Sequence, residues 1–152
     1  MKVEFHPMTE ADIPALISPM TRAFDDDARR FLGQQRGGPD GYDDGSFLRR
    51  YGLRDHASSP YTIMVNGSPV GAFIVYWRRH GESVLGNLFL DPSVQDRGIG
   101  LETWRYIESQ FPSRAWRLET PSWAVRNHYF YEKCGFRRIG QDDRQVIYGK
   151  SQ

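Results

Sequence analysis

Two glycines one residue apart, Gly98 and Gly100, lie between an apolar run and a helical pattern, and this order suits the binding of a phosphate. Glycine lets backbone N–H groups approach an anion closely, and the first turn of a helix adds unpaired N–H groups and a positive dipole end. The ligand that this arrangement favours is a pyrophosphate resting on amides from Asp96 to Leu101. An ordinary strand-to-helix turn also needs glycine in order to bend, so the two glycines alone leave both interpretations open.

The residues around these glycines resemble the Gln/Arg-x-x-Gly-x-Gly/Ala signature of the GNAT superfamily, the acyl-CoA-dependent N-acetyltransferases. Gln95, Gly98 and Gly100 fall in register with it. A second block, from Phe130 to Phe136, looks like the tyrosine-bearing helix of that family and its Tyr-x-x-x-Gly-Phe exit. The resemblance is strong over residues 70–139 and looser before them. It implies an acyl-CoA N-acyltransferase fold with acetyl-CoA as the co-substrate and no metal.

The resemblance also implies where acetyl-CoA binds. In the family, the pantetheine arm lies along the strand before the glycines as though it were another strand, and the pyrophosphate rests on the loop that follows. Asn127 is a candidate because the family often has an asparagine where this chain has Ala124, and residues 124, 127 and 131 share one face of a helix. The implied cofactor-binding residues are Leu88, Phe89, Leu90, Gln95, Asp96, Arg97, Gly98, Ile99, Gly100, Leu101 and Asn127.

Acetyl transfer to an amine needs one group that takes a proton from the amine and one that gives a proton to the departing thiolate. Glu119 matches the base position of the ribosomal-protein alanine acetyltransferases of the superfamily; a solvated glutamate, with water as the base, is the alternative. Tyr131 matches the general acid of the family, and a packed core aromatic is the alternative. Cys134 is expected to be a buried structural thiol and no nucleophile, which favours direct transfer in a ternary complex.

Length and composition exclude several classes of protein. The 152 residues predict a single N-acetyltransferase domain over 1–152. A formal net charge of +1, with arginine and aspartate interleaved, argues against a nucleic-acid partner. The single cysteine excludes an internal disulfide. The N-terminus has no apolar leader and no apolar run approaches the roughly 20 residues that cross a bilayer, so we expect a soluble, cytoplasmic protein without a membrane partner.

Two helices are expected in the first part of the chain. Apolar residues at helical spacing indicate a helix over residues 13–24, but Pro14 and Pro19 fall inside it, so we expect it to be broken. The glycine- and aspartate-rich segment 34–45 predicts a mobile surface loop. A second helix is expected over residues 46–56, with Ser46 as its N-cap.

Strand patterns dominate the rest. Asn66-Gly67, between two β-branched and aromatic runs, predicts a hairpin. Helical patterns follow Gly100, up to Pro112, and cover residues 122–133. The expected strands are residues 3–6, 61–65, 70–78, 83–91, 115–120, 136–139 and 145–148. Together with the resemblance, these elements predict an α/β fold with a mixed, mostly antiparallel sheet of six to seven strands and helices on both faces.

The acceptor is the least constrained part of this interpretation. Two acidic groups fall where the family places its acceptor side, and they would attract a cationic amine, although charge runs more often form solvated faces. These groups are Asp25, Asp26 and Asp27, and Asp40, Asp43 and Asp44. The favoured acceptor is a small-molecule amine. Two alternative functions stay open: a protein or peptide N-acetyltransferase, and a non-catalytic acyl-CoA-binding regulatory module. A homodimer also stays open, because dimers are common in families of this kind.

Overall fold

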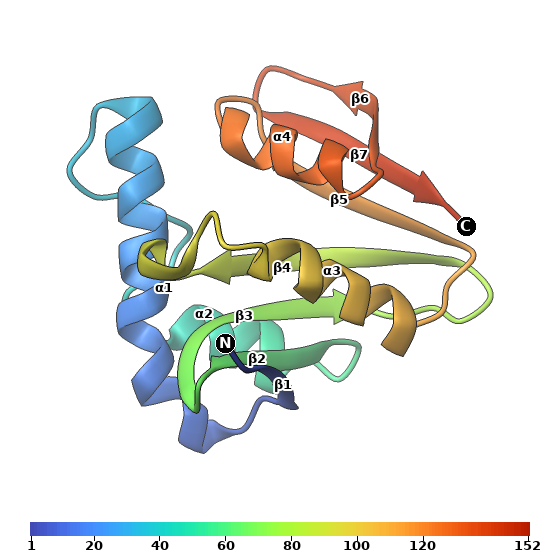
Figure 1. Ribbon diagram of the computed structural model, residues 1–152. Helices are drawn as coiled ribbons and strands as arrows, with labels where there is room; N and C mark the ends of the chain where they lie inside the picture. The colour runs from blue at the N-terminus through green and yellow to red at the C-terminus, as the bar shows by residue number, and fades with distance from the viewer.

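The computed structural model describes residues 1–152, whose strands form one sheet in the order β1-β2-β3-β4-β5-β7-β6 (Figure 1). The strands are β1 (Val3–Pro7), β2 (Ser59–Val65), β3 (Ser68–Tyr76), β4 (Glu82–Leu90), β5 (Ala115–Pro121), β6 (Arg137–Gln141) and β7 (Gln145–Ser151). The helices are α1 (Ile13–Asp27), α2 (Ser46–Leu48), α3 (Ile99–Gln110) and α4 (Val125–Lys133). Short helical turns are η1 (Glu10–Asp12), η2 (Ala28–Leu32), η3 (Arg49–Leu53) and η4 (Pro92–Val94).

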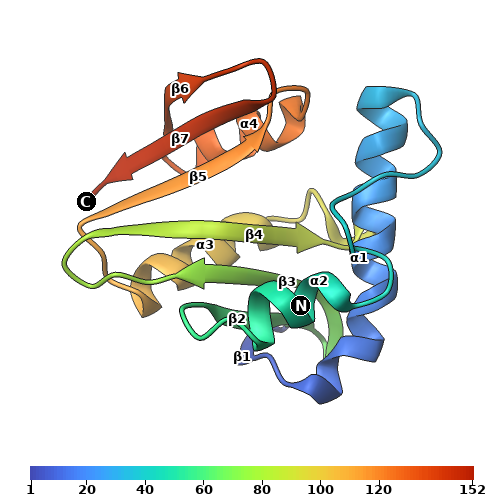
Figure 2. The ribbon, with the colours of Figure 1, turned by 180° about the vertical axis from the view of Figure 1, so that it is seen from behind.

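The sheet is antiparallel except between β4 and β5, its two central strands. These two pair in parallel over only three residue pairs, the last of which joins Val84 to Arg117. Beyond that point the strands diverge, and Figures 1 and 2 show the opening between them. The sheet therefore consists of an N-terminal half and a C-terminal half that share a short ladder.

Helices cover both faces of the sheet. Phe73 and Val75 of β3 belong to one core cluster with Trp104 and Ile107 of α3. Ala72 and Ile74 of β3 point the other way and pack in a second cluster with α1 and α2. The two views agree: α3 lies in front of the sheet in Figure 1, and α2 lies in front of it in Figure 2. The predicted fold class is confirmed.

The first helix is continuous, and the expectation of a broken helix was wrong. Pro14 lies in the first turn, where a missing N–H breaks no helical hydrogen bond. Pro19 lies in the interior, yet the helix runs on to Asp27 and into the wider turn η2. The buried apolar side chains on this face of α1 compensate for the single lost hydrogen bond; they are Ile13, Leu16 and Met20.

Other boundaries differ in smaller ways. The second helical segment ends at Leu53, three residues earlier than expected, and its N-cap is Gly45 at a φ of 85°, one residue before Ser46. The hairpin turn is confirmed: Asn66 and Gly67 have φ values of 50° and 82°, as a two-residue turn with both central residues left-handed requires. None of the helices is both long and apolar enough to cross a membrane.

Candidate active site

The divergence of β4 from β5 opens a cleft of about 350 Å³ at the centre of the molecule. Five parts of the chain line it: α1, β4, the loop from Gln95 to Gly100, the end of β5, and α4. In Figure 1, α1 passes beside the tip of β4, and Ala23, Phe24 and Asp27 of α1 line the cleft. The ring centroid of Phe31, in η2, lies 6.3 Å from that of Trp123, in the segment between β5 and α4.

Most of the residues predicted to bind the cofactor line this cleft. The side chains of Arg97 and Ile99 do not: Arg97 is exposed, and Ile99 is buried in the core, which leaves Ile99 only its backbone N–H to offer an anion. The predicted residues along the cleft are Leu88, Phe89, Leu90, Gln95, Asp96, Gly98, Gly100, Leu101 and Asn127.

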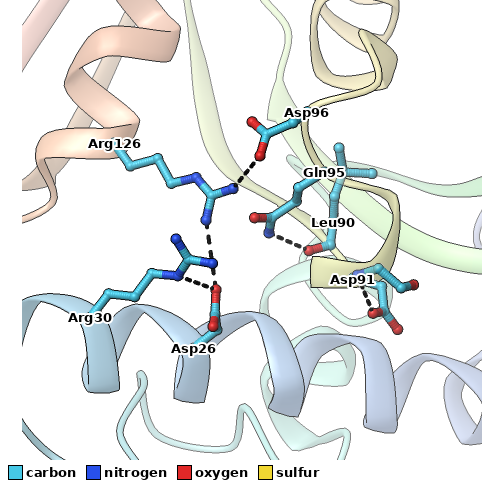
Figure 3. Close-up of polar contacts among 8 residues, drawn as sticks. Asp26, Arg30, Leu90, Asp91, Gln95, Asp96 and Arg126 are labelled. Carbon is cyan, nitrogen blue, oxygen red and sulfur yellow. Dashed lines mark hydrogen bonds and ion pairs between the residues drawn. The ribbon is translucent and has the colours of Figure 1, made fainter.

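The loop before α3 is held in place by its own side chains (Figure 3). Gln95 Nε2 donates a hydrogen bond of 2.9 Å to the carbonyl oxygen of Leu90. The carboxylate of Asp91 accepts a hydrogen bond of 3.0 Å from the N–H of Ser93 and forms an ion pair with Arg22 of α1. Gly98 caps α3 at a φ of 82°, and a side chain added there would meet nothing within 4 Å. The α3 N-terminus therefore opens onto free space, as an anion site needs.

Gly100 has a different role from Gly98. A Cβ on Gly100 would lie 2.8 Å from Cε1 of Phe130, so this glycine is needed for close packing between α3 and α4. Of these two glycines, Gly98 alone has both the left-handed backbone and the open space that close approach of a ligand calls for.

Tyr131 and Glu119 reach the same cleft from different elements. Tyr131, on α4, is 9% exposed, and burial raises the pKa of its hydroxyl, with a smaller contribution from Cys134. A tyrosine with a raised pKa keeps its proton at neutral pH. Glu119, near the end of β5, has a side chain 55% exposed and pairs with Arg117 at 3.3 Å. The structure thus offers a buried proton donor and a solvent-linked carboxylate.

Asn127 is fixed by β5. Its Nδ2 donates a 3.2 Å hydrogen bond to Oγ1 of Thr120, and the side chain lies on the cleft. Ala124 is the N-cap of α4 and is buried, with no side-chain cap. Asn127 therefore has the position on the cleft that its helical spacing from Tyr131 predicts.

Two further charged residues line the cleft, Asp27 and Arg126. Asp27 belongs to one of the acidic groups expected on the acceptor side, whereas Arg126 was not identified from the sequence. Asp27 lies on the α1 face that carries Ala23 and Phe24 toward the cleft. Burial raises the pKa of Asp27, Asp26 raises it further, and the charge of Arg126 acts in the opposite direction. Of the six acidic residues considered for the acceptor side, only Asp27 lines the cleft.

Arg126, on α4, is the second of these residues (Figure 3). Its Nη2 donates a hydrogen bond of 3.2 Å to the carboxylate of Asp96 in the loop before α3, and its Nη1 lies 3.6 Å from the carboxylate of Asp26 of α1. It therefore connects three elements at the open end of the cleft. No local pattern marks it, because both of its partners are remote in sequence.

The other acidic residues have structural roles. Asp25 is buried and accepts hydrogen bonds from Tyr42 at 2.6 Å and from the N–H of Gly37 at 3.1 Å. Although burial opposes its charge, these bonds and Arg36 hold its pKa below the usual range. Asp43 pairs with Arg36 at 2.9 Å, and Asp44 accepts from Ser46. None of these residues, nor Asp40, lines the cleft.

Cys134 is buried, and burial raises its pKa to about 12. A thiol with such a pKa is protonated at neutral pH and is a poor nucleophile. The expectation of a structural thiol is confirmed.

A sheet split between β4 and β5, with a glycine loop, a helix N-terminus and a buried tyrosine around the opening, is the architecture of an acyltransferase of the GNAT type. The model of the acetyltransferase (GNAT) family matches residues 20–136, and the chain belongs to this family. The predicted family is confirmed.

Two solved structures share the fold over the whole chain. An acetyltransferase from Thermus thermophilus has a TM-score of 0.81 at 15% identity, covering 100% of this chain and 98% of that one. The PaiA N-acetyltransferase from Thermoplasma acidophilum, in complex with coenzyme A, has a TM-score of 0.76 at 16% identity, covering 100% of both chains. Among curated proteins, the uncharacterized YrkN of Bacillus subtilis (strain 168) is 34% identical over 82 residues, which span 52% of this chain and 44% of YrkN.

Proposed function

We propose that this protein transfers the acetyl group of acetyl-CoA to the primary amine of a small molecule, by direct attack in a ternary complex. One observation carries the proposal: a single cleft brings together the open N-terminus of α3 at Gly98, the protonated hydroxyl of Tyr131 and the carboxylate of Glu119. Family membership supports acetyl transfer, and the coenzyme A bound to the PaiA relative supports the co-substrate. The single sheet supports one acetyltransferase domain over residues 1–152.

The pantetheine arm of acetyl-CoA would lie along β4 where this strand has lost its pairing with β5. Its amides would use the free strand edge, and the pyrophosphate would rest on the amides from Asp96 to Leu101. Asn87 of β4 also supports this placement, because its Oδ1 is buried on the cleft without a hydrogen-bond donor. An amide N–H of the arm would supply that donor.

The thioester carbonyl would face the irregularity in β4. The register between β3 and β4 shifts between Ile74 and Val75, which leaves Gly86 without a partner on β3. A bulge of this kind turns backbone groups away from the ladder, and Gly86 lines the cleft. A backbone N–H at this point would polarise the carbonyl oxygen and stabilise the negative charge that develops on it.

The transfer then needs two proton movements. The amine, deprotonated through Glu119 directly or through water, attacks the carbonyl carbon, and the new C–N bond forms as the carbonyl oxygen gains negative charge. When the tetrahedral intermediate collapses, the C–S bond breaks and Tyr131 passes its proton to the sulfur of coenzyme A, while the second proton of the amine nitrogen leaves and restores the Tyr131 hydroxyl through water. The amine proton held at Glu119 passes to solvent, to which this exposed side chain has access. The products are an acetylated amine and free coenzyme A.

Asp27 favours a cationic acceptor. Its carboxylate lines the cleft and forms neither a hydrogen bond nor an ion pair within the 4 Å range that defines one, whereas Asp25 and Asp26 are both partnered. An ammonium group on the acceptor would supply the missing partner and would orient a second amine toward the thioester. We therefore place diamines, polyamines and aminoglycosides ahead of peptides as acceptors.

The experiment that tests this function follows thiol release from acetyl-CoA with a panel of polyamines, aminoglycosides, amino acids and short peptides. Turnover with a small cationic amine is the expected result. Turnover with peptides alone would replace the small-molecule acceptor by a protein. Binding of acetyl-CoA without turnover of any amine would contradict the enzyme and favour a regulatory module.

A further inference from the structure

Arg126 has a donor that the protein itself does not satisfy. Its Nη1 is buried and has no hydrogen-bond partner, because Asp26 lies 3.6 Å away, outside hydrogen-bonding range. Most buried N–H donors in proteins have an acceptor, so an orphaned guanidinium nitrogen calls for an explanation. Arg126 lines the cleft, and an acceptor that enters the cleft would explain it.

The surroundings of Arg126 indicate which acceptor would fit. Its other nitrogen, Nη2, contacts Asp96, and Asp96 belongs to the loop that leads to the open α3 N-terminus at Gly98. Figure 3 shows the guanidinium reaching from α4 toward this loop. A guanidinium facing a glycine loop and a helix N-terminus across a cleft is a geometry that matches two adjacent phosphate groups, since arginine binds phosphate oxygens in a bidentate way.

We propose that Arg126 binds the diphosphate of the acyl-CoA co-substrate, and that it does so by exchanging Asp96 for phosphate oxygens. This inference rests on the proposed function and adds to it a cofactor ligand on the far side of the cleft from the glycine loop. Arg126 is then the cationic half of the diphosphate site, and the α3 N-terminus is the other half.

Asp96 is the partner that gives way. Its side chain is 86% exposed, so it can turn into solvent, where water replaces its contact to Arg126. Asp26, by contrast, is 17% exposed and is also bound by Arg30 at 2.9 Å. The contact with Asp26 therefore persists and holds the guanidinium at the cleft while Asp96 leaves.

The test compares the dissociation constants of coenzyme A, dephospho-coenzyme A and pantetheine, measured by calorimetry on the full chain. Dephospho-coenzyme A keeps the diphosphate and lacks the 3′-phosphate; pantetheine lacks both. Arg126→Gln should weaken binding of the first two ligands about tenfold or more and leave that of pantetheine within about twofold. Asp96→Asn should tighten binding of the first two by about two- to fivefold, because it removes the competing anion.

Arg30→Gln is the matched control, since Arg30 shares Asp26 with Arg126 but does not line the cleft; all three affinities should stay at the wild-type values. An equal loss for all three ligands in Arg126→Gln would overturn the proposal in favour of a structural role. Unchanged binding of coenzyme A in Arg126→Gln would also overturn the proposal. A loss of affinity confined to coenzyme A would overturn it too, because it would assign Arg126 to the 3′-phosphate. If Arg126→Gln melts early, the tightening in Asp96→Asn decides the question alone. Failure of the wild-type protein to bind coenzyme A would instead contradict the proposed function.

Discussion

Burial distinguishes the titratable side chains of the cleft from one another. Burial raises the pKa of Tyr131, so its hydroxyl keeps its proton at neutral pH until a strongly basic group such as a departing thiolate is formed beside it. The pKa of Asp27 is also raised by burial, but this carboxyl stays close to the charge of Arg126. Glu119 is more than half exposed and can exchange protons with water. The proposed mechanism thus assigns the proton donor, the acceptor anchor and the proton relay to three different side chains, and each can be tested alone.

Replacing Tyr131 by phenylalanine removes the proton donor and keeps the ring that packs in the core. We expect kcat to fall about 100-fold or more, with the dissociation constant of acetyl-CoA unchanged. Initial rates and equilibrium binding measure the two quantities. Tyr106→Phe, which removes a hydroxyl on α3 away from the cleft, is the control and should turn over like wild type. A fall in thermal stability with full turnover in Tyr131→Phe would make Tyr131 a core aromatic.

Replacing Asp27 by asparagine should make the protein more stable and less able to bind a cationic acceptor. A carboxyl whose pKa is raised in the folded state destabilises the fold above that pKa, and this penalty disappears as pH falls through it. The melting temperature of Asp27→Asn should therefore exceed that of wild type at pH 8, and the difference should shrink as the pH approaches 4. The KM for the acceptor should rise while acetyl-CoA affinity holds. A lower melting temperature at pH 8 would show that the charge of Asp27 stabilises the fold.

Among the elements, α1 is the one whose continuity the sequence obscured, and it carries Asp27 to the cleft. Local rules located the Asn66-Gly67 hairpin, since its turn needs two left-handed residues. The same rules broke α1 at its prolines, because the apolar face that compensates for Pro19 is buried only in the folded protein. The close packing of Gly100 against Phe130 was hidden for a similar reason, since Phe130 is 30 positions away in the chain.

The segment between α1 and α2 is tied down by one buried hydrogen bond. Tyr42 and Asp25 are both buried, and the hydroxyl of Tyr42 donates to Asp25. Tyr42→Phe removes this bond and leaves the buried carboxylate short of a donor, so the free energy of unfolding should fall by about 1–3 kcal/mol. Urea unfolding measures the loss. Tyr51→Phe, at an exposed ring, should change it by less than about 0.5 kcal/mol; equal effects in the two variants would deny the bond any special importance.

At the scale of the whole molecule, two buried carboxylates attach α1 to the rest of the protein. Asp91 pairs with Arg22 of α1, and Asp25 binds Tyr42 and Gly37. For both, burial opposes the charge, but hydrogen bonds and a nearby arginine prevail and lower the pKa. The sequence could predict the sheet and its central glycine loop, which follow from periodicity and turn chemistry. It could not predict the contacts of Asp25 and Asp91, or those of Arg126 with Asp96 and Asp26, because the residues in each contact come together only after folding.

These two groups make the protein sensitive to acid. A carboxyl with a lowered folded pKa stabilises the fold above its unfolded value of about 3.9, and this stabilisation is lost as the pH falls from there through the folded pKa. We expect the free energy of unfolding in urea to be lower at pH 3 than at pH 6. Asp91→Asn should be less stable than wild type at pH 6 and should lose less on acidification. If Asp91→Asn loses as much stability between pH 6 and pH 3 as wild type does, Asp91 does not contribute to the acid sensitivity.

The short ladder between β4 and β5 has a consequence for how the protein meets other chains. Past Val84 and Arg117, the sheet has two inner borders whose backbone groups lack a neighbouring strand. Such borders recruit extended segments of any chain that reaches them, which is the first step of many aggregation reactions. Here they face each other inside the molecule, α1 passes beside the tip of β4, and Phe31 of η2 lies near Trp123 at the same end. The fold therefore keeps two unpaired strand edges inside the molecule. A co-substrate bound between them would cover these edges and so oppose self-association, in addition to taking part in the reaction.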